Sequence, residues 1–505
     1  MNHNKLRAFI RSTSFSFLVL TVLVAPLVSA TASASPALLI RQVLIQRLIR
    51  AAAGIDQAAS AANQGQPAGR HTRQLGELNL LGGLNADVWA HGDFAYIGTW
   101  SGPCPGTGVK IIDVSDSAHP FQVATAAGYP NTSAEDMQVI SVQTDFFTGD
   151  LLGVGLQDCG LPDQAPGLTG LDLWDVTDPT NPVHFGFYDV GPSGGVHEVS
   201  LTKRTIDGHE RVFGLAAVPF AEVISTAFTD TPRGDFQLIE VTDPTNPTLA
   251  DDWGAGKDGG LAFGATFFGD FLPSPFDCTP PPGQEPLCRG HFAAVFAHST
   301  SPSADGMTAY VAYWDAGGII LDMSNPNDLQ MVGRTIYPAG SEGDTHSAVP
   351  NESDSLLVTT DEDFSPSERK AAGEPKIVGD TWGFARIWSL ADPTLPTHLS
   401  DFATPHALTN KTDAFYSVHN PEIRGNTLYL SWYSDGVRIV DISNPSNPQE
   451  IAFYRPKPTL DPTGTFISFG AGDHPIPFVW GVHVVGDRIY LSDINFGLYI
   501  VTRRT

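Results

Sequence analysis

The feature that most constrains the fold is one short segment that recurs along the chain with small changes. Its clearest copy is GVRIVDISNPSNP at Gly436–Pro448, an apolar run closed by a turn rich in Asn, Ser and Pro. Related copies begin at Gly108, Gly170, Asp235, Gly318 and Phe384, and a truncated copy ends the chain at Gly497–Thr505. Self-similarity at a spacing of about 40–60 residues indicates a repeat architecture. We therefore expect the chain to fold as a series of similar units.

Each repeat contains the pattern of four strands. VHVVGDRIYLSD at Val482–Asp493 predicts two strands joined by a hairpin turn at Gly486–Asp487. The recurrent segment is the third strand, and a fourth, such as EIAFY at Glu450–Tyr454, follows the proline-containing turn. Four antiparallel strands per repeat form the blade of a β-propeller. The fold class is therefore all-β, with only strands and turns expected from Leu75 onward.

The repeats can be counted from their third strands. They cover 84–128, 133–190, 195–254, 291–338, 344–403, 415–455 and 480–505. The last repeat lacks a fourth strand because the sequence stops at Thr505, and Leu75–Leu81 has the character of the missing strand. Such a strand would close the ring and leave no long unpaired edge. The sequence predicts a seven-bladed β-propeller over 73–505, closed by an N-terminal strand.

These segments resemble a known family. IIDVSD, IVDISNP, LYIV and the longer AHSTSPSADGMTAYVAYWDAGGIILDMSNP and SVHNPEIRGNTLYLSWYSDGVRIVDISNP are similar to the LVIVD-repeat proteins, exported β-propellers of bacteria and archaea. The resemblance covers about 80–505 and implies a propeller at the cell surface or outside the cell. It implies no established activity, so no catalytic residue is carried over from it.

The N-terminal region predicts export. Residues 1–34 have the form of a signal peptide: Lys5, Arg7 and Arg11 precede the apolar Phe15–Val28, and small residues follow. An uncleaved membrane anchor is the alternative. Residues 35–72 are interpreted as a helical segment followed by a Gly/Gln-rich linker. The helix, basic and amphipathic, could lie on a membrane or pack on the propeller.

Charge and cysteine content narrow the partners and the compartment. A net charge of -27 favours solubility and excludes nucleic acid, because nothing would neutralise the phosphates. We expect a secreted or cell-surface monomer with no membrane span after signal cleavage. Four cysteines in an exported chain predict two disulfides. We expect Cys278–Cys288 within a Pro-rich loop and Cys104–Cys159 between equivalent points of neighbouring repeats, although spacing alone leaves the other pairings open.

Histidines recur at one position of the first strands. They are His197, His298, His346 and His419, and His483 in the last repeat is displaced by a few residues. First strands line the channel of a propeller, so these imidazoles are predicted to converge at one mouth. Neutral imidazoles can bind Zn, Cu, Fe or Ni. Alternatively, each histidine hydrogen-bonds a neighbouring backbone and has a structural role only.

Several other polar or aromatic residues accompany these histidines. Glu135, Asp136, Glu198 and Trp480 are predicted to contribute to a ligand pocket at the channel mouth. The carboxylates could instead be strand-end groups in water. The acidic run Asp361–Asp363 is interpreted as a solvated loop, with Ca²⁺ binding as the alternative. The insertions at about 255–290 and 364–380 are expected to be face loops.

Two functions follow from these patterns. The first is an exported scaffold that binds a protein, glycan or small ligand through its channel mouth and face loops. The second is a metal-dependent enzyme that uses the histidine cluster with Cu, Fe or Zn. Its geometry, though no motif, is similar to the carotenoid-cleaving oxygenases and the copper-dependent methanethiol oxidases. The sequence identifies neither the ligand nor catalytic residues.

Overall fold

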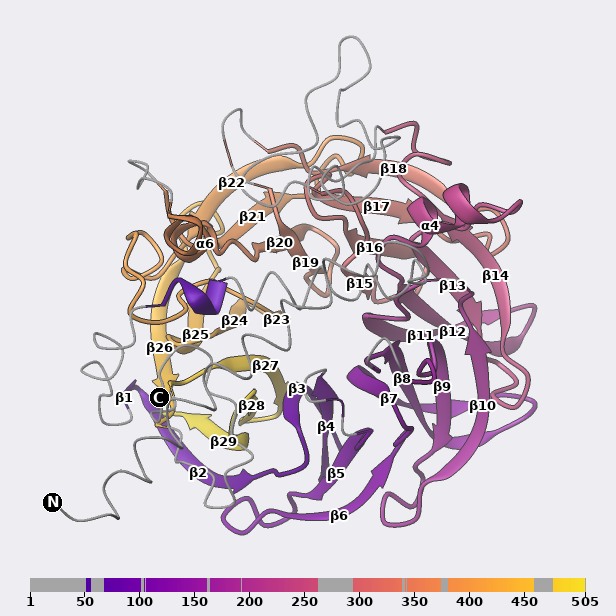
Figure 1. Ribbon diagram of the computed structural model, residues 1–505, viewed down its shortest axis with the longest axis horizontal. Helices are drawn as coiled ribbons and strands as arrows, with labels where there is room; N and C mark the ends of the chain where they lie inside the picture. The colour runs from indigo at the N-terminus through magenta and orange to yellow at the C-terminus, as the bar shows by residue number, and fades with distance from the viewer. Residues whose placement is uncertain are drawn as a thin grey trace, which may run out of the picture.

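The structure is a computed structural model of the chain. It describes residues 51–55, 68–100, 104, 106–160, 164–191, 193–261, 294–337, 341, 343–373, 380–457 and 476–504. The predicted signal peptide and most of the predicted helical segment lie outside the described residues. The sheets are arranged in a ring, with β3, β7, β11, β15, β19, β23 and β27 facing its centre (Figure 1).

The strands fall into successive groups, each of which we call a run. Each run begins with a strand at the centre of the ring and continues outward in antiparallel order. The first two runs are β3 (Leu84–His91), β4 (Phe94–Trp100), β5 (Val109–Asp113) and β6 (Phe121–Ala126), and then β7 (Thr132–Gln143), β8 (Thr148–Asp158), β9 (Gly170–Asp175) and β10 (Val183–Asp189). A pairing of Thr99 in β4 with Ala134 in β7 joins these two runs into one eight-stranded sheet.

The next three runs form separate four-stranded sheets. The first is β11 (Glu198–Ile206), β12 (His209–Ala217), β13 (Phe236–Glu240) and β14 (Thr248–Trp253). The second is β15 (Ser299–Pro302), β16 (Thr308–Ala312), β17 (Gly318–Asp322) and β18 (Gln330–Arg334). The third is β19 (Thr345–Pro350), β20 (Leu356–Asp361), β21 (Ala385–Ser389) and β22 (Thr397–Phe402).

The last two runs each include a strand from the N-terminal region. One sheet contains β23 (Pro421–Arg424), β24 (Thr427–Trp432), β25 (Gly436–Asp441), β26 (Gln449–Arg455) and the short β1 (Ala68–Arg70). The other contains β27 (Val479–Val485), β28 (Arg488–Asp493), β29 (Gly497–Arg503) and β2 (Thr72–Asn79). The predicted outer strand Leu75–Leu81 thus overlaps β2, and residues 68–70, predicted as linker, form a strand held by an Arg70–Glu450 ion pair of 2.9 Å.

Apolar side chains fill the spaces between neighbouring sheets. Between the first and last runs, Val88, Ile97 and Ile112 pack in one cluster with Leu498 and Ile500. The backbone also joins these runs, because the Asn85 N–H donates to the oxygen of Ile494 at 2.9 Å. Burial of these surfaces fixes the innermost strands around a common centre.

In the described part of the chain two short helices interrupt the strands, so the prediction of strands and turns alone from Leu75 onward is wrong. The helix α4 (Ala221–Phe228) lies between β12 and β13, and α6 (Ser365–Ala372) follows β20 within the insertion predicted as a loop. Near α6, Ala51 and Ile55 are buried in the same apolar cluster as Trp382. The described end of the predicted helical segment therefore packs on the domain.

The predicted Cys104–Cys159 disulfide is present, with a Cα–Cα distance of 5.5 Å. It links the loop after β4 to the end of β8, which are neighbouring runs. The predicted Cys278–Cys288 pair lies outside the described residues. Within the described part of the chain, no helix has both the length and the apolar character needed to span a membrane.

Candidate metal and ligand site in the central channel

The innermost strands place two layers of polar side chains in the channel. His197 and His298 immediately precede β11 and β15, His346 lies in β19, and His419 lies two residues before β23. These histidines form the first layer. The residues directly after them in the sequence form the second layer: Glu198, Ser299, Ser347 and Asn420. Register shifts in β3, β7, β19 and β27 occur at the same region, and such bulges re-aim side chains near functional sites.

Four histidines form a continuous row, which we call the histidine row: His197, His298, His346 and His419. All four side chains are buried. The Nε2 atoms of His197 and His298 are 2.9 Å apart, so one of them donates a hydrogen to the other. The ring centroids of His298 and His346 are 4.0 Å apart, as are those of His346 and His419.

A carboxylate begins the row. Glu135 Oε2 lies 3.0 Å from His197 Nδ1, and both side chains are buried. Burial lowers the pKa of His197, but the attraction and the hydrogen bond of Glu135 outweigh it, so that this pKa is raised overall. The predicted ligand-site residue Glu135 therefore contacts the row directly.

The other end of the row lies against Trp480. His419 Nδ1 is 2.8 Å from the backbone oxygen of Trp480, and the two rings are 4.4 Å apart. Because a carbonyl oxygen only accepts, His419 carries its hydrogen on Nδ1 and a lone pair on Nε2. This Nε2 is buried and has no hydrogen-bond partner among the described residues. Burial lowers the pKa of His419 to about 3 and keeps the ring neutral.

A chain of hydrogen bonds fixes the proton on His346. The Asn420 amide donates to Asp87 at 2.6 Å, and Ser347 Oγ donates to the Asn420 amide oxygen at 3.1 Å. Ser347 Oγ is therefore free to accept the hydrogen of His346 Nδ1, 2.8 Å away. This arrangement places the lone pair of His346 on Nε2.

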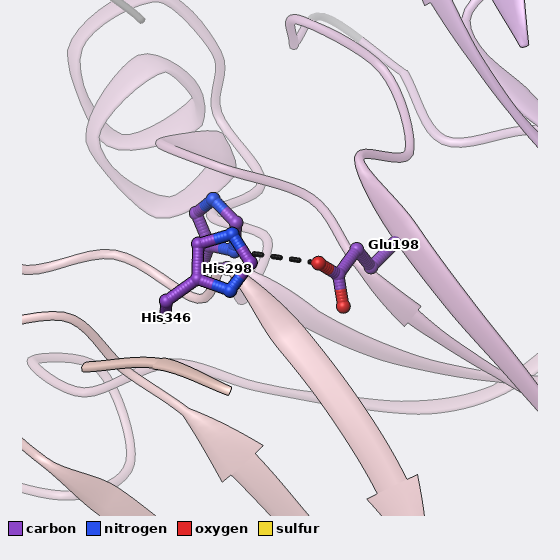
Figure 2. Close-up of side chains that lie close together, drawn as sticks. All are labelled: Glu198, His298 and His346. Carbon is purple, nitrogen blue, oxygen red and sulfur yellow. Dashed lines mark ion pairs between the residues drawn. The ribbon is translucent and has the colours of Figure 1, made fainter. Parts of the chain in front are cut away.

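Two groups of three residues hold their potential metal-ligand atoms within 4.8 Å of one another. One is Glu198, His298 and His346, in which Glu198 Oε1 lies 3.7 Å from His298 Nδ1 (Figure 2). The other is His346, Glu362 and His419. Imidazole and carboxylate are common ligands of divalent transition metals.

Glu362 is a member of this second group that the sequence did not identify. It is 8% exposed, and its neighbours Asp361 and Asp363 are 2% and 5% exposed, so the interpretation of this run as a solvated loop is wrong. Asp361 pairs with Arg386 at 2.9 Å, and Asp363 accepts a hydrogen bond from the Ser365 N–H at the start of α6. The Tyr433 hydroxyl donates to Glu362.

A cavity of about 340 Å³ occupies the channel beside the row, and its lining includes the predicted residues Asp136, Glu198 and His483. The ring of His483 packs on Trp89 with centroids 3.9 Å apart, and its Nδ1 lies 3.2 Å from Glu422. His483 thus takes part in the cavity wall and not in either of the two three-residue groups.

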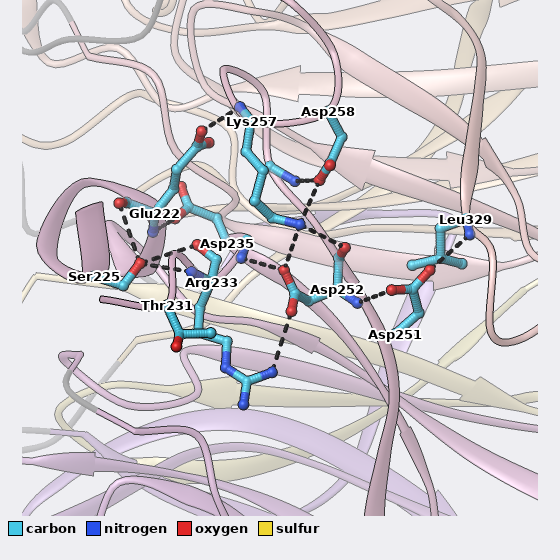
Figure 3. Close-up of polar contacts among 12 residues, drawn as sticks. Glu222, Ser225, Thr231, Arg233, Asp235, Asp251, Asp252, Lys257, Asp258 and Leu329 are labelled. Carbon is cyan, nitrogen blue, oxygen red and sulfur yellow. Dashed lines mark hydrogen bonds and ion pairs between the residues drawn. The ribbon is translucent and has the colours of Figure 1, made fainter. Parts of the chain in front are cut away.

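A separate buried polar cluster surrounds α4 (Figure 3). Asp235 accepts a hydrogen bond of 2.7 Å from the Glu222 N–H, and Glu222 in turn accepts from the N–H groups of Gly256 and Lys257. The Lys257 ammonium pairs with Asp252 at 2.9 Å. These carboxylates bind groups of their own chain, so the cluster holds α4 and the following loop in place.

Comparison with known proteins identifies the repeats. Residues 82–125, 303–336 and 419–455 match the LVIVD repeat model. No curated protein sequence matches the chain. One similar solved structure is the computationally designed Ika8 protein, with 8% sequence identity, a TM-score of 0.43, and coverage of 85% of this chain and 99% of that one. Another is the Cps50 (Swd1) β-propeller domain of Myceliophteria thermophila, with 13% sequence identity, a TM-score of 0.43, and coverage of 86% of this chain and 100% of that one. Three segments of this all-β chain therefore match the LVIVD repeat.

Proposed function

We propose that this protein is an exported, seven-bladed β-propeller that serves as a binding scaffold and holds a divalent transition-metal ion in its channel. The observation that carries the metal proposal is the buried Nε2 lone pair of His419, which has no partner among the described residues and lies within a group with His346 and Glu362. A buried acceptor without a partner is costly unless a ligand satisfies it.

The ligand atoms are oriented as metal ligands usually are. The Nδ1 hydrogens of His346 and His419 are engaged by Ser347 Oγ and the Trp480 oxygen, which leaves each Nε2 as the donor atom. The hydroxyl of Tyr433 holds the third ligand, Glu362. Partners of this kind fix the imidazole tautomer and strengthen binding in known metal sites. Two imidazoles and one carboxylate suit Zn²⁺, Fe²⁺ or Cu²⁺.

Elemental analysis of protein purified without an affinity tag tests the metal. We expect one equivalent of Zn, Fe or Cu in the wild type and its loss in a His346→Ala, His419→Ala double variant. The matched control is a His119→Ala, His209→Ala double variant, because these side chains are 83% and 62% exposed. Equal metal content in all three proteins, or none in the wild type, contradicts the proposal.

The blade count is supported by the pairing of β2 with β29. It gives the last run four strands and brings Leu75 and Leu78 against the cluster between the first and last runs. The outer strand of the last run thus comes from the opposite end of the described chain, which ties the two ends of the ring together.

Export is supported by the form of residues 1–34 and by the Cys104–Cys159 disulfide. Disulfides of this kind persist mainly outside the cytoplasm. The test is N-terminal sequencing of protein recovered from the medium or cell surface, which we expect to begin close to residue 35. A product that begins at Met1 contradicts this part of the proposal.

A metal-dependent oxidase or oxygenase is the second candidate function. It is favoured by the group of Glu198, His298 and His346, because Glu198 also lines the cavity. Three protein ligands leave a coordination position open to a small molecule. A Co²⁺-substituted protein whose visible spectrum shifts when azide is added would support this candidate, and an unchanged spectrum would leave the scaffold function.

A further inference from the structure

All seven innermost strands, or the residues just before them, contribute to the wall of the cavity beside the histidine row. Asp87, Asp136 and Glu198 come from the three consecutive strands β3, β7 and β11. Ser299, Ser347 and Asn420 come from the next three runs. The cavity thus has an acidic side, and a mixed side where the polar Ser299, Ser347 and Asn420 lie with Glu352, Glu422 and Arg424.

Among the described lining residues, no lysine or arginine pairs with Asp87, Asp136 or Glu198. Arg424 and His483, which also line the cavity, pair with Glu422 at 2.6 Å and 3.2 Å. Burial, with Asp136 and Glu135 adding to it, raises the pKa of Asp87 well above its usual range. Burial also raises the pKa of Asp136 to about 7. A cation in the cavity would lower both pKa values, because it stabilises the ionised carboxylates.

Glu198 supplies an independent observation. Its side chain is on the cavity wall although the residue is only 9% exposed. No described residue donates a hydrogen bond to its carboxylate, and its ion pair with His298 Nδ1, at 3.7 Å, exceeds hydrogen-bond length. A carboxylate so buried lacks the partners that such groups normally have.

Asp87 and Asp136 do not form a metal site with Glu198. Neither of the groups whose ligand atoms lie within 4.8 Å of one another contains Asp87 or Asp136. Those carboxylates are therefore too far apart, or too poorly aimed, to bind one bare ion together with Glu198. The cavity volume of about 340 Å³ equals roughly ten water-sized groups, which suits a small organic molecule.

Apolar side chains complete the wall and suit a hydrocarbon portion of the ligand. They are Val88, Val199, Val349, Ile423 and Val482. The ring of Trp89 also lines the cavity and can contact a cation through its π-system. An aliphatic chain that bears ammonium groups matches both parts of this lining.

We propose that the central cavity binds an organic cation of the aliphatic diamine class, whose two ammonium groups are held by different members of the set Asp87, Asp136 and Glu198. The hydroxyls of Ser299 and Ser347 and the Asn420 amide provide polar contacts on the opposite side. This inference concerns the same channel as the proposed metal but does not depend on that metal.

Calorimetric titration of the full chain with 1,4-diaminobutane, in the presence of a chelator, tests the inference. We expect saturable binding of 1,4-diaminobutane and none of 1,4-butanediol, which has the same length and no charge. Equal binding of the two, no binding of the diamine, or, in a titration without the chelator, full displacement by Mg²⁺ or Ca²⁺ at equal concentration overturns the inference. This comparison needs no variant.

Variants then assign the site. Asp87→Asn and Asp136→Asn should each weaken diamine binding by about tenfold, the cost of removing one charged partner. Asp328→Asn, the same change in an exposed turn, should have no effect. Unchanged affinity in both cavity variants overturns the assignment.

Metal content separates the two proposals. Asp87→Asn and Asp136→Asn should retain the metal content of the wild type, whereas His419→Ala should lose the metal and still bind the diamine. Each proposal can therefore fail without the other.

Discussion

The Nδ1 of His419 donates a hydrogen bond of 2.8 Å to the backbone oxygen of Trp480. This bond settles the tautomer of a fully buried imidazole and turns its Nε2 lone pair toward the group formed with His346 and Glu362. The same backbone oxygen also accepts from Ser431 Oγ at 2.7 Å. The Trp480 carbonyl therefore keeps a partner even when the imidazole is replaced.

This arrangement predicts that His419→Phe removes metal binding and preserves the fold. Phenylalanine retains a ring of similar size, and Ser431 still satisfies the Trp480 oxygen. A metal at 100 times its Kd stabilises the folded chain by about 2.7 kcal/mol. We expect excess Zn²⁺ to raise the Tm of the wild type and not that of His419→Phe, as measured by differential scanning calorimetry. An equal rise in both proteins contradicts the assignment of His419.

The raised pKa of Asp136 predicts a pH-dependent effect of Asp136→Asn on stability. Between about pH 4 and pH 7 the folded chain retains a proton on Asp136 that the unfolded chain releases, because the folded pKa is about 7. Raising the pH through this window therefore favours unfolding. Asparagine carries no such proton, so the stability of the variant does not fall for this reason as the pH rises.

Urea unfolding at pH 4.5 and pH 7.5 measures the effect. The free energy of unfolding of Asp136→Asn, minus that of the wild type, should increase by on the order of 2–4 kcal/mol from pH 4.5 to pH 7.5. The variant also removes the repulsion that Asp136 adds at Asp87, and this acts in the same direction as the loss of the Asp136 proton. Asp328→Asn serves as the control for charge removal. Parallel pH profiles of wild type and Asp136→Asn would show that Asp136 ionises normally.

The repeats could be predicted because they depend on local patterns. The apolar run before each proline turn predicts the third strand, and β5, β9, β13, β17, β21, β25 and β29 are those strands. The Cys104–Cys159 pair followed from equivalent positions in neighbouring repeats. The histidines were found by the same alignment, and the structure brings four of them into contact.

Features that depend on tertiary contacts could not be predicted. The segment of α4 is eight residues long, and a helix this short is stable only through packing and its contacts with Asp235 and the loop at Lys257. Glu362 lies in an acidic run that resembles a solvated loop, and its role depends on residues distant in sequence: Tyr433 donates to it, and it lies in one group with His346 and His419. The tautomers of His346 and His419 likewise depend on partners distant in sequence.

The Cys104–Cys159 disulfide gives a prediction for stability. It joins residues separated by 55 positions and ties the first run of strands to the second. Removing it increases the entropy of the unfolded chain and should cost about 2–4 kcal/mol. We expect a Cys104→Ser, Cys159→Ser variant to unfold at lower urea concentration with an unchanged m-value. A variant as stable as the wild type would show that the bridge contributes nothing.

Closure of the ring by β2 gives the last prediction. Deleting residues 1–81 removes β1 and β2, leaves β29 as an unpaired edge, and uncovers the apolar cluster between the first and last runs. We expect a lower Tm and association into oligomers, measured by calorimetry and light scattering. Deleting residues 1–63 retains both strands and should keep the chain monomeric. It removes buried Ile55, which costs about 1.5–3 kcal/mol.

A point variant separates strand pairing from chain length. A Cβ added at Gly76 in β2 would lie 1.8 Å from the backbone oxygen of Ser117 in the first run. Gly76→Val should therefore displace β2 and reproduce the association expected for the longer deletion. A deletion of residues 1–81 that stays monomeric with an unchanged Tm would show that β2 does not close the ring.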